Sequence, residues 1–214
     1  MSEMRYEGTE KLNPFFSIWL STRKTVRYVL EHKSLKYSLT LAAIAGVPGA
    51  INSTNELSKY FSDLSLWFWL LCIILLGPIF GLISVGIGAV IYTWVGKWFG
   101  GSGTIREMAQ MMGVTVIPSI WLTPYWILSF IFVHNNLFIM NFWEVTSGAM
   151  IWFILSNLFT LTYSIWMIII QSKAIGEVHQ FSSGKGFATL IIPGIVLGII
   201  LFIITFFIIT MTTF

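Results

Sequence analysis

The chain has 214 residues, of which 56% are apolar and 10% are charged, and its formal net charge is +3. Soluble domains carry roughly 25% charged residues, so the composition excludes a soluble globular class and favours an all-α polytopic membrane protein. The small net charge gives no indication of nucleic-acid binding. The only cysteine, Cys72, excludes a disulfide framework and a cysteine zinc site.

Residues 1–36 are predicted to form a cytoplasmic N-terminal segment that contains an amphipathic helix. Asn13-Pro14 has the form of an N-cap followed by proline at the first helical position. Apolar side chains then approximate one helical stripe, with basic residues beside it: Phe15, Phe16, Trp19, Val26 and Leu30, and Arg23, Lys24 and Arg27. This pattern predicts an interfacial helix on the inner leaflet with its basic side toward anionic headgroups. The alternative is a helix packed beneath the bundle.

Residues 37–214 are predicted to form a bundle of five transmembrane helices, since about 20 apolar residues cross the hydrocarbon core. The five predicted spans are residues 37–51, 66–95, 109–133, 145–171 and 187–210. The first is short, which leaves open whether it crosses completely. The second exceeds the hydrocarbon thickness, so it must tilt, kink near Gly77-Pro78 or emerge into the interface. Pro118 and Pro124 are expected to kink the third.

The distribution of basic residues tests the weak first span. With five spans and a cytoplasmic N-terminus, 11 of the 12 basic residues face inward and only Lys59 faces outward. If residues 37–51 did not cross, the counts would be 8 inside and 4 outside. The positive-inside rule therefore favours a multi-pass protein of the cell membrane with five spans and its C-terminus outside.

Two short inner loops carry the most polar sequence. Residues 100–104 read Gly-Gly-Ser-Gly-Thr and lack the lysine of a phosphate-binding loop, whereas Thr104 and Glu107 match a capping box. A tight turn before a helix is therefore predicted there. The second loop contains Glu177 and His179, which are too few to hold a metal. We expect a polar loop that contacts the bundle, and neither a metal nor another cofactor.

Small and polar residues inside the spans are explained by helix packing. Gly77 and Gly81 form a small-xxx-small pair. Three polar residues share a face of the fourth span: Asn157, Thr160 and Ser164. Three more recur every four residues on the third span, where a substrate path is the alternative: Thr115, Ser119 and Thr123. No ionisable residue lies in the middle of a predicted span, which disfavours catalysis and ion-coupled transport.

Three groups of residues follow one another in a characteristic order along nearly the whole chain. They are Asn13-Pro14 with Trp19 and residues 22–25, then residues 100–104 with Arg106-Glu107, Gly113 and Pro118, then residues 174–182 with Lys185 and Ala188. Together they resemble the Yip1 domain family, although Thr22 stands where many relatives carry proline. The resemblance implies a cytoplasmic N-terminus and five helices, in agreement with the charge count, and it supplies no catalytic residue.

Eukaryotic Yip1 members resemble adaptors of vesicle traffic that engage Rab-type GTPases. They use a long cytoplasmic region that has no counterpart in this sequence, so that activity is not expected here. The compact form is similar to bacterial members, for some of which the resemblance implies an association with ABC-type exporters.

The sequence thus predicts a non-enzymatic adaptor or accessory protein that binds lipids and other membrane proteins or organises the local bilayer. ABC transporter components are candidate partners, and a homo-oligomer is left open. The predicted contacts are Trp19, Arg23, Lys24, Arg27, Arg106, Glu177 and His179. The alternative is a transporter or channel subunit for a small or hydrophobic solute. An intramembrane enzyme would have to use Glu177 and His179.

Overall fold

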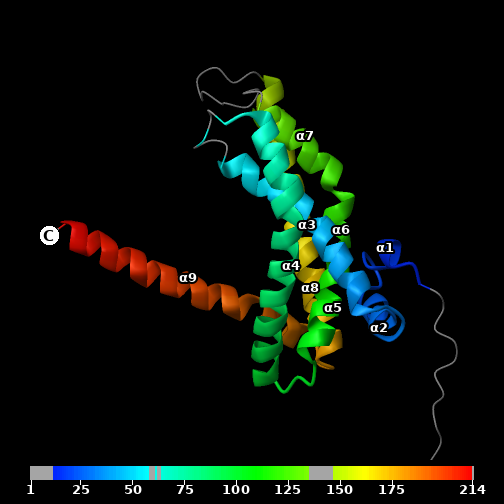
Figure 1. Cartoon of the computed structure of the whole chain (residues 1–214). Coiled ribbons are helices and arrows are strands. Elements are labelled where there is room, and N and C mark those ends of the chain that lie inside the picture. Colours follow the sequence, from blue (N-terminus) through cyan, green and yellow to red (C-terminus); the bar gives the residue numbers. More distant parts are fainter. Residues whose placement is uncertain (1–11, 58–60, 62–63, 135–146, 214) are drawn as a thin grey trace, which may run out of the picture.

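The computed structural model describes residues 12–57, 61, 64–134 and 147–213, and within these residues all regular structure is helical. In chain order the helices are α1 (Pro14–Ser17), α2 (Thr22–His32), α3 (Leu35–Leu57), α4 (Leu66–Trp98), α5 (Ile105–Thr115), α6 (Ile117–Trp121), α7 (Thr123–His134), α8 (Ser147–Val178) and α9 (Ser183–Thr213). Figure 1 shows α3 to α8 as an elongated bundle, with α1 and α2 beside one end of it.

Three helices are long and apolar enough to cross a membrane: Leu66–Trp98, Ile154–Val178 and Ser183–Met211. They correspond to the second, fourth and fifth predicted spans. At about 1.5 Å per residue, the 33 residues of α4 rise roughly 50 Å, well beyond the roughly 30 Å hydrocarbon core. The apolar part of α3, Leu35–Ile51, is shorter than these. By length and composition, the described residues therefore give clear support to three membrane crossings, and not to five.

The third predicted span is interrupted near each of its two prolines, in agreement with the kinks expected there. The chain breaks after Thr115 and again at Leu122, giving three consecutive helices α5, α6 and α7. Pro118 lies in the first turn of α6, and Pro124 is the second residue of α7. Proline lacks a backbone N–H and is tolerated in a first turn, where that donor has no helical partner, so each proline begins a helix.

The N-terminal segment is likewise two helices, separated by a turn before Thr22. The Asn13 side chain accepts a hydrogen bond from the Phe15 N–H at 3.1 Å, which confirms the predicted N-cap. The buried face of α2, which includes Val26 and Val29, packs against α5 and α8. The packing of α2 is thus that of a helix beneath the bundle, and its contact with the inner leaflet stays a prediction.

Helices α3 and α4 approach each other closely at three glycines. A Cβ atom added to Gly46 would overlap the carbonyl of Gly77, and one added to Gly81 would overlap the backbone of Ala42. Gly77 and Gly81 therefore occupy the helix contact that their spacing predicts. Gly49 lies one turn from Gly46, yet a Cβ there meets nothing within 4 Å.

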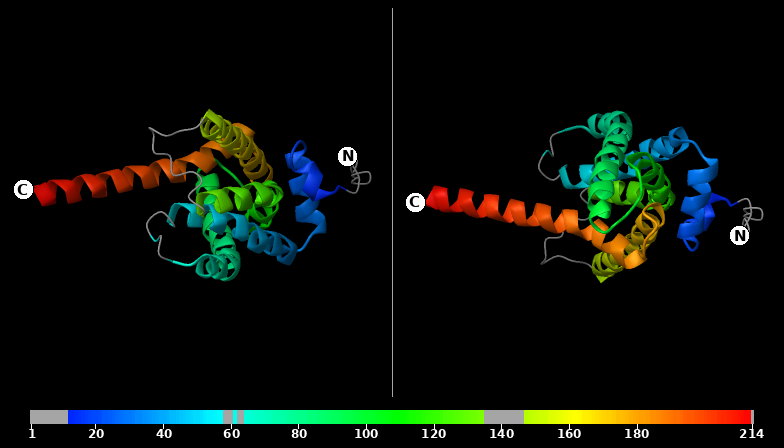
Figure 2. Two further views of the ribbon diagram at one scale, coloured as in Figure 1. Left: turned by 90° about the horizontal axis from the view of Figure 1, so that it is seen from above. Right: turned by 90° about the horizontal axis from the view of Figure 1, so that it is seen from below.

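Helix α9 leaves the bundle on the side opposite to α1 and α2, as both views in Figure 2 show. Its first turns pack against α8 and α4. None of its most apolar segment is buried against the rest of the described chain. A helix that is apolar on every side and lacks protein cover is suited to contact with lipid.

We predict that Gly46→Ala lowers the free energy of unfolding by about 1–3 kcal/mol, because backbone atoms of α4 cannot move aside for the new methyl group. Gly49→Ala is the matched control on the same helix, and it should be neutral or stabilise by up to about 1 kcal/mol. Thermal unfolding in detergent, followed by circular dichroism, compares the two. Equal melting temperatures would show that the helix contact is looser than described.

Candidate functional site

Segments far apart in sequence meet at one end of the bundle. Figure 1 shows α2 near the end of α8, with the turn between α4 and α5 and the start of α9 at the same end. We call this site the polar junction and define it by Arg23, Arg27, Gly103, Glu177 and His179. Its ionisable groups come from α2 and from the C-terminal end of α8, so it ties an early helix to a late one.

The carboxylate of Glu177 is shared by two arginines. Arg27 Nη2 lies 2.7 Å from Oε1, and Arg23 Nη1 lies 3.3 Å from Oε2. Arg23 also donates to the carbonyl of Phe181 at 2.9 Å and to Ser183 Oγ at 3.1 Å. Glu177 is 3% exposed, whereas the two arginine side chains are 37% and 50% exposed. The site therefore buries one negative charge beneath two positive charges that still reach water.

Local sequence rules bring these groups together. Arg23 and Arg27 are four residues apart and so lie on one face of α2. Gly176 precedes Glu177, and a Cβ there would lie 2.7 Å from Arg23 Nη2. The missing side chain at Gly176 makes room for the guanidinium group that closes over the carboxylate.

His179 is 1% exposed, and both of its ring nitrogens are engaged. Nδ1 accepts from the backbone N–H of Gly103 at 3.2 Å, and Nε2 lies 3.2 Å from the carbonyl of Tyr92. Only the neutral tautomer with hydrogen on Nε2 satisfies both partners. Burial lowers the pKa of His179; the bond to Tyr92 opposes this shift, and Lys97 adds to it.

Glycines surround the His179 ring on several sides. A Cβ added to Gly96 or Gly101 would overlap the imidazole, and one at Gly103 would meet both the ring and Val178. The glycine-rich turn thus does more than reverse the chain: it admits a buried imidazole. His179 also stacks on Phe181, with ring centroids 5.2 Å apart and an interplanar angle of 8°.

The predicted capping box at the start of α5 is confirmed. Thr104 Oγ1 accepts from the Glu107 N–H at 3.3 Å, and Glu107 Oε2 accepts from the Thr104 N–H at 2.9 Å. Lys185 Nζ donates to the carbonyl of Phe99 at 3.1 Å, which links α9 to the same turn. The turn is therefore held from both sides.

The predicted contact residues differ in how far they are exposed. Lys24 and Arg106 are exposed, and the described structure gives neither an ion pair. Trp19 is half-buried against the main apolar cluster. Glu177 and His179 are covered, so in this conformation they hold the polar junction together and do not offer a contact surface.

The polar residues predicted to pack α8 behave differently from one another. Thr160 Oγ1 lies 3.4 Å from the Tyr125 hydroxyl on α7, so it joins two helices. Ser164 donates to the carbonyl of Thr160 within its own helix, at 2.8 Å. Asn157 is exposed on α8.

The three hydroxyl residues of the third span lie on three consecutive helices, α5, α6 and α7, and differ in their partners. The Ser119 hydroxyl lies 2.7 Å from that of Tyr163 on α8. Thr115 and Thr123 each donate to a carbonyl three residues earlier. Packing and local bonds thus occupy all three hydroxyl groups.

Two features of the site were not predicted. The pairing of Glu177 with Arg23 and Arg27 joins residues about 150 positions apart, and no local pattern signals it. Gln110 on α5 donates to the carbonyls of Val29 and Lys33, a second link to the end of α2. Within the described residues, no group of three or more His, Cys, Asp or Glu residues could hold a metal ion.

The family model described as the Yip1 domain matches residues 16–205, nearly the whole chain. No curated protein and no solved structure matches. The family match confirms the resemblance based on the three groups of residues. Each of those groups contributes to the polar junction: α2, the turn at residues 100–104, and the end of α8.

We predict that removing the two arginines of the ion-pair cluster lowers the free energy of unfolding more than removing the carboxylate does. Arg23→Met with Arg27→Met should cost about 3 kcal/mol of unfolding free energy, because it leaves a buried carboxylate unpaired. Glu177→Gln should cost less, about 1–2 kcal/mol, since the arginines can turn toward water. Adding Glu177→Gln to the double variant should restore stability. Lys24→Met is the control and should change stability by less than about 0.5 kcal/mol; a double variant no worse than Glu177→Gln would contradict this account.

We also predict that acid destabilises the protein through His179. Because its pKa is lower in the folded state, the unfolded chain takes up the proton first as pH falls. The contribution of His179 is therefore complete above pH 6.5 and decreases as pH falls below that value toward the folded pKa. Melting temperatures between pH 8 and 5 should fall less for His179→Gln than for the unchanged protein. A His179→Gln profile parallel to that of the unchanged protein would remove this assignment.

Proposed function

Because this chain belongs to the Yip1 domain family of membrane proteins, we propose that it is a non-enzymatic accessory protein that docks other membrane proteins at the polar junction. The observation that supports this is that residues of all three family motifs meet at the polar junction. The site holds a buried carboxylate between two arginines and an imidazole bonded on both nitrogens, so it is preorganised, and preorganisation lowers the cost of binding.

Positive charge around the polar junction suggests the chemistry of the partner. Four cations near this end are exposed and have no ion pair within the described chain: Lys24, Lys97, Arg106 and Lys173. An acidic segment that lies next to the membrane in the partner is complementary to them, and charge complementarity contributes mainly specificity and association rate. Components of ABC-type exporters are candidate partners, and this suggestion rests only on the membership of the family.

The proposed threading, meaning the order in which the helices cross the membrane, has the five crossings predicted from the sequence. It places the polar junction in the cytoplasm and the C-terminus outside. Its support is the count of 11 inward basic residues out of 12. The 23 residues of α3 rise about 35 Å, and those of α5 to α7 together about 45 Å, so both are long enough to cross. Packing against α4 and α8 covers part of their surface.

The side chains of the polar junction are poorly placed for acid–base catalysis. The Glu177 carboxylate is held by two guanidinium groups, and His179 has a partner on each nitrogen, so neither is placed to accept a proton from a substrate. A transporter or channel subunit is the second candidate, favoured by the proline-broken path of α5 to α7. Flux into liposomes that contain only this chain separates that candidate from a docking protein.

We predict that Lys24→Glu with Arg106→Glu weakens partner recovery about tenfold, equivalent to about 1.4 kcal/mol, because both exposed charges are reversed. Affinity purification from native membranes in mild detergent, with quantitative mass spectrometry, measures the recovery. Lys24→Arg with Arg106→Lys preserves both charges and is the matched control. A chain that is recovered alone, or a reversed variant that keeps its partners, contradicts the proposal.

A further inference from the structure

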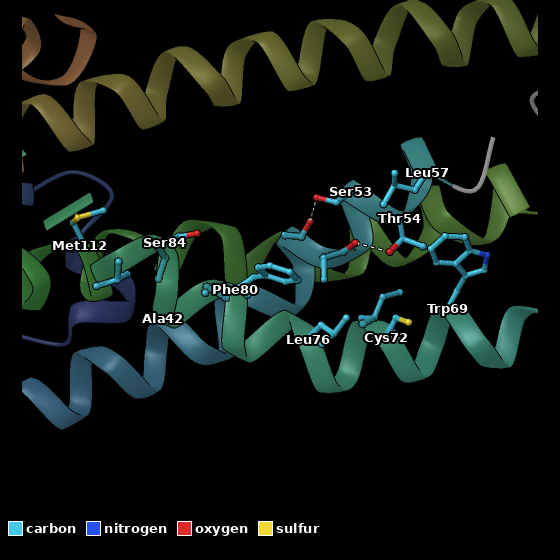
Figure 3. Close-up of a pocket in the computed structure, with 18 of the residues that line it drawn as sticks. Ala42, Ser53, Thr54, Leu57, Trp69, Cys72, Leu76, Phe80, Ser84 and Met112 are labelled. Atoms are coloured by element: carbon cyan, nitrogen blue, oxygen red, sulfur yellow. Dashed lines mark hydrogen bonds between the residues drawn. The ribbon is translucent and has the colours of Figure 1, made fainter. Parts of the chain in front are cut away.

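A long apolar groove runs between α3 and α4. Its volume is about 710 Å³, within the range of roughly 300–1,000 Å³ that is usual for small-molecule sites. The α3 side is formed by small residues, among them Ala42, Gly49 and Ser53. Bulky exposed residues of α4, such as Leu76 and Phe80, stand along the other side, as Figure 3 shows. The groove is therefore narrow and open along one side.

The described residues that line the groove carry no charge. The hydroxyl groups of Ser53 and Thr54 are hydrogen-bonded within α3. Ser53 Oγ donates to the carbonyl of Gly49 at 3.2 Å, and Thr54 Oγ1 donates to that of Ala50 at 2.8 Å; Figure 3 draws both bonds. A polar solute would lose its hydration in this groove and find little to replace it. An aliphatic chain suits it, since each buried methylene contributes about 0.8 kcal/mol.

The length of the groove indicates which aliphatic chain. From Ala42 to Leu57 the α3 wall rises about 22 Å. One leaflet is half of the roughly 30 Å hydrocarbon core, about 15 Å. The groove is thus long enough to hold the whole acyl chain of a lipid in one leaflet, with space left at the end for the ester groups.

One end of the groove differs from the rest. Trp69 lies there beside Thr54, close to the start of α4, where the helix enters the bilayer in the proposed threading. The side chain is 6% exposed, and within the described chain its Nε1–H has no acceptor. A buried donor without a partner costs about 1–3 kcal/mol, so an acceptor that reaches this N–H after a small rotation of the indole is favoured.

We propose that the α3–α4 groove binds one acyl chain of a membrane phospholipid, with the ester oxygens at the Trp69 end and the methyl end near Ala42. The ligand is a phospholipid and not a free fatty acid, because the site pairs an uncharged donor with space for a whole acyl chain, and the described residues that line it include no cation for a carboxylate. This inference rests on the proposed crossing of α3 and α4.

The test uses the full chain in vesicles of phosphatidylethanolamine and phosphatidylglycerol. A trace of the phosphatidylglycerol carries a photoreactive diazirine at the end of one acyl chain. After irradiation, mass spectrometry of peptides should find adducts concentrated at the inner end of the groove, at Ala42, Ser84 and Met112, which all line it. Excess unlabelled phosphatidylglycerol should compete, and palmitate should not.

Matched glycine variants test occupancy of the groove. Gly49→Leu fills it without a backbone clash, since nothing lies within 4 Å of a Cβ there, and should lower adduct yield about tenfold. Gly86→Leu is equally unobstructed but lies on α4 outside the groove, and it should leave the yield unchanged. Trp69→Phe keeps an aromatic ring at this position but removes the donor, and it should lower the yield a few-fold.

Several results would overturn the inference. These are equal yields for the two glycine variants, adducts mainly on the exposed faces of α4 and α9, competition by palmitate, or protection of the groove by a second copy of the chain. Lys24→Glu with Arg106→Glu should keep its adducts, so a failure of partner docking is distinguishable from a failure of lipid binding. A reporter after Phe214 that is reached only from the cytosol would instead overturn the threading itself.

Discussion

The buried carboxylate of Glu177 is the constraint on which the rest of this structure depends. Removing a carboxylate from water is costly unless cations and hydrogen bonds replace the water. Arg23 and Arg27 supply that replacement, and in doing so they fix α2 against the end of α8. Because α2 also packs on α5, this one charge sets the relative positions of three helices.

Glycines determine how closely the surrounding elements approach. Gly176 admits a guanidinium group, residues 96–103 admit an imidazole, and Gly46 with Gly77 allows two backbones to touch. Between helices in lipid the hydrophobic effect gives little attraction, so close packing and hydrogen bonds must supply it. Gly46 and Gly81 also line the apolar groove, so the small residues that allow the two helices to touch leave space beside the contact.

Features governed by near neighbours could be predicted from the sequence, and those governed by distant contacts could not. The Asn13 cap, the box formed by Thr104 and Glu107, and the length of α4 follow from a few consecutive residues. The interruptions near Pro118 and Pro124 also follow from the sequence, because proline lacks the N–H that would continue the helix. The neighbours of Glu177 and His179 lie 76 to 154 residues away, and no periodicity encodes them.

The separation of 150 residues between Arg27 and Glu177 has a consequence during synthesis. At about 5–20 residues per second, the ribosome needs roughly 10–30 s to make the intervening chain. The first helices must wait in the membrane through that interval before their acidic counterpart is translated. A nascent chain that stops short of α8 carries both arginines without the Glu177 carboxylate that they share in the folded protein, so α2 cannot yet take its final position against the bundle.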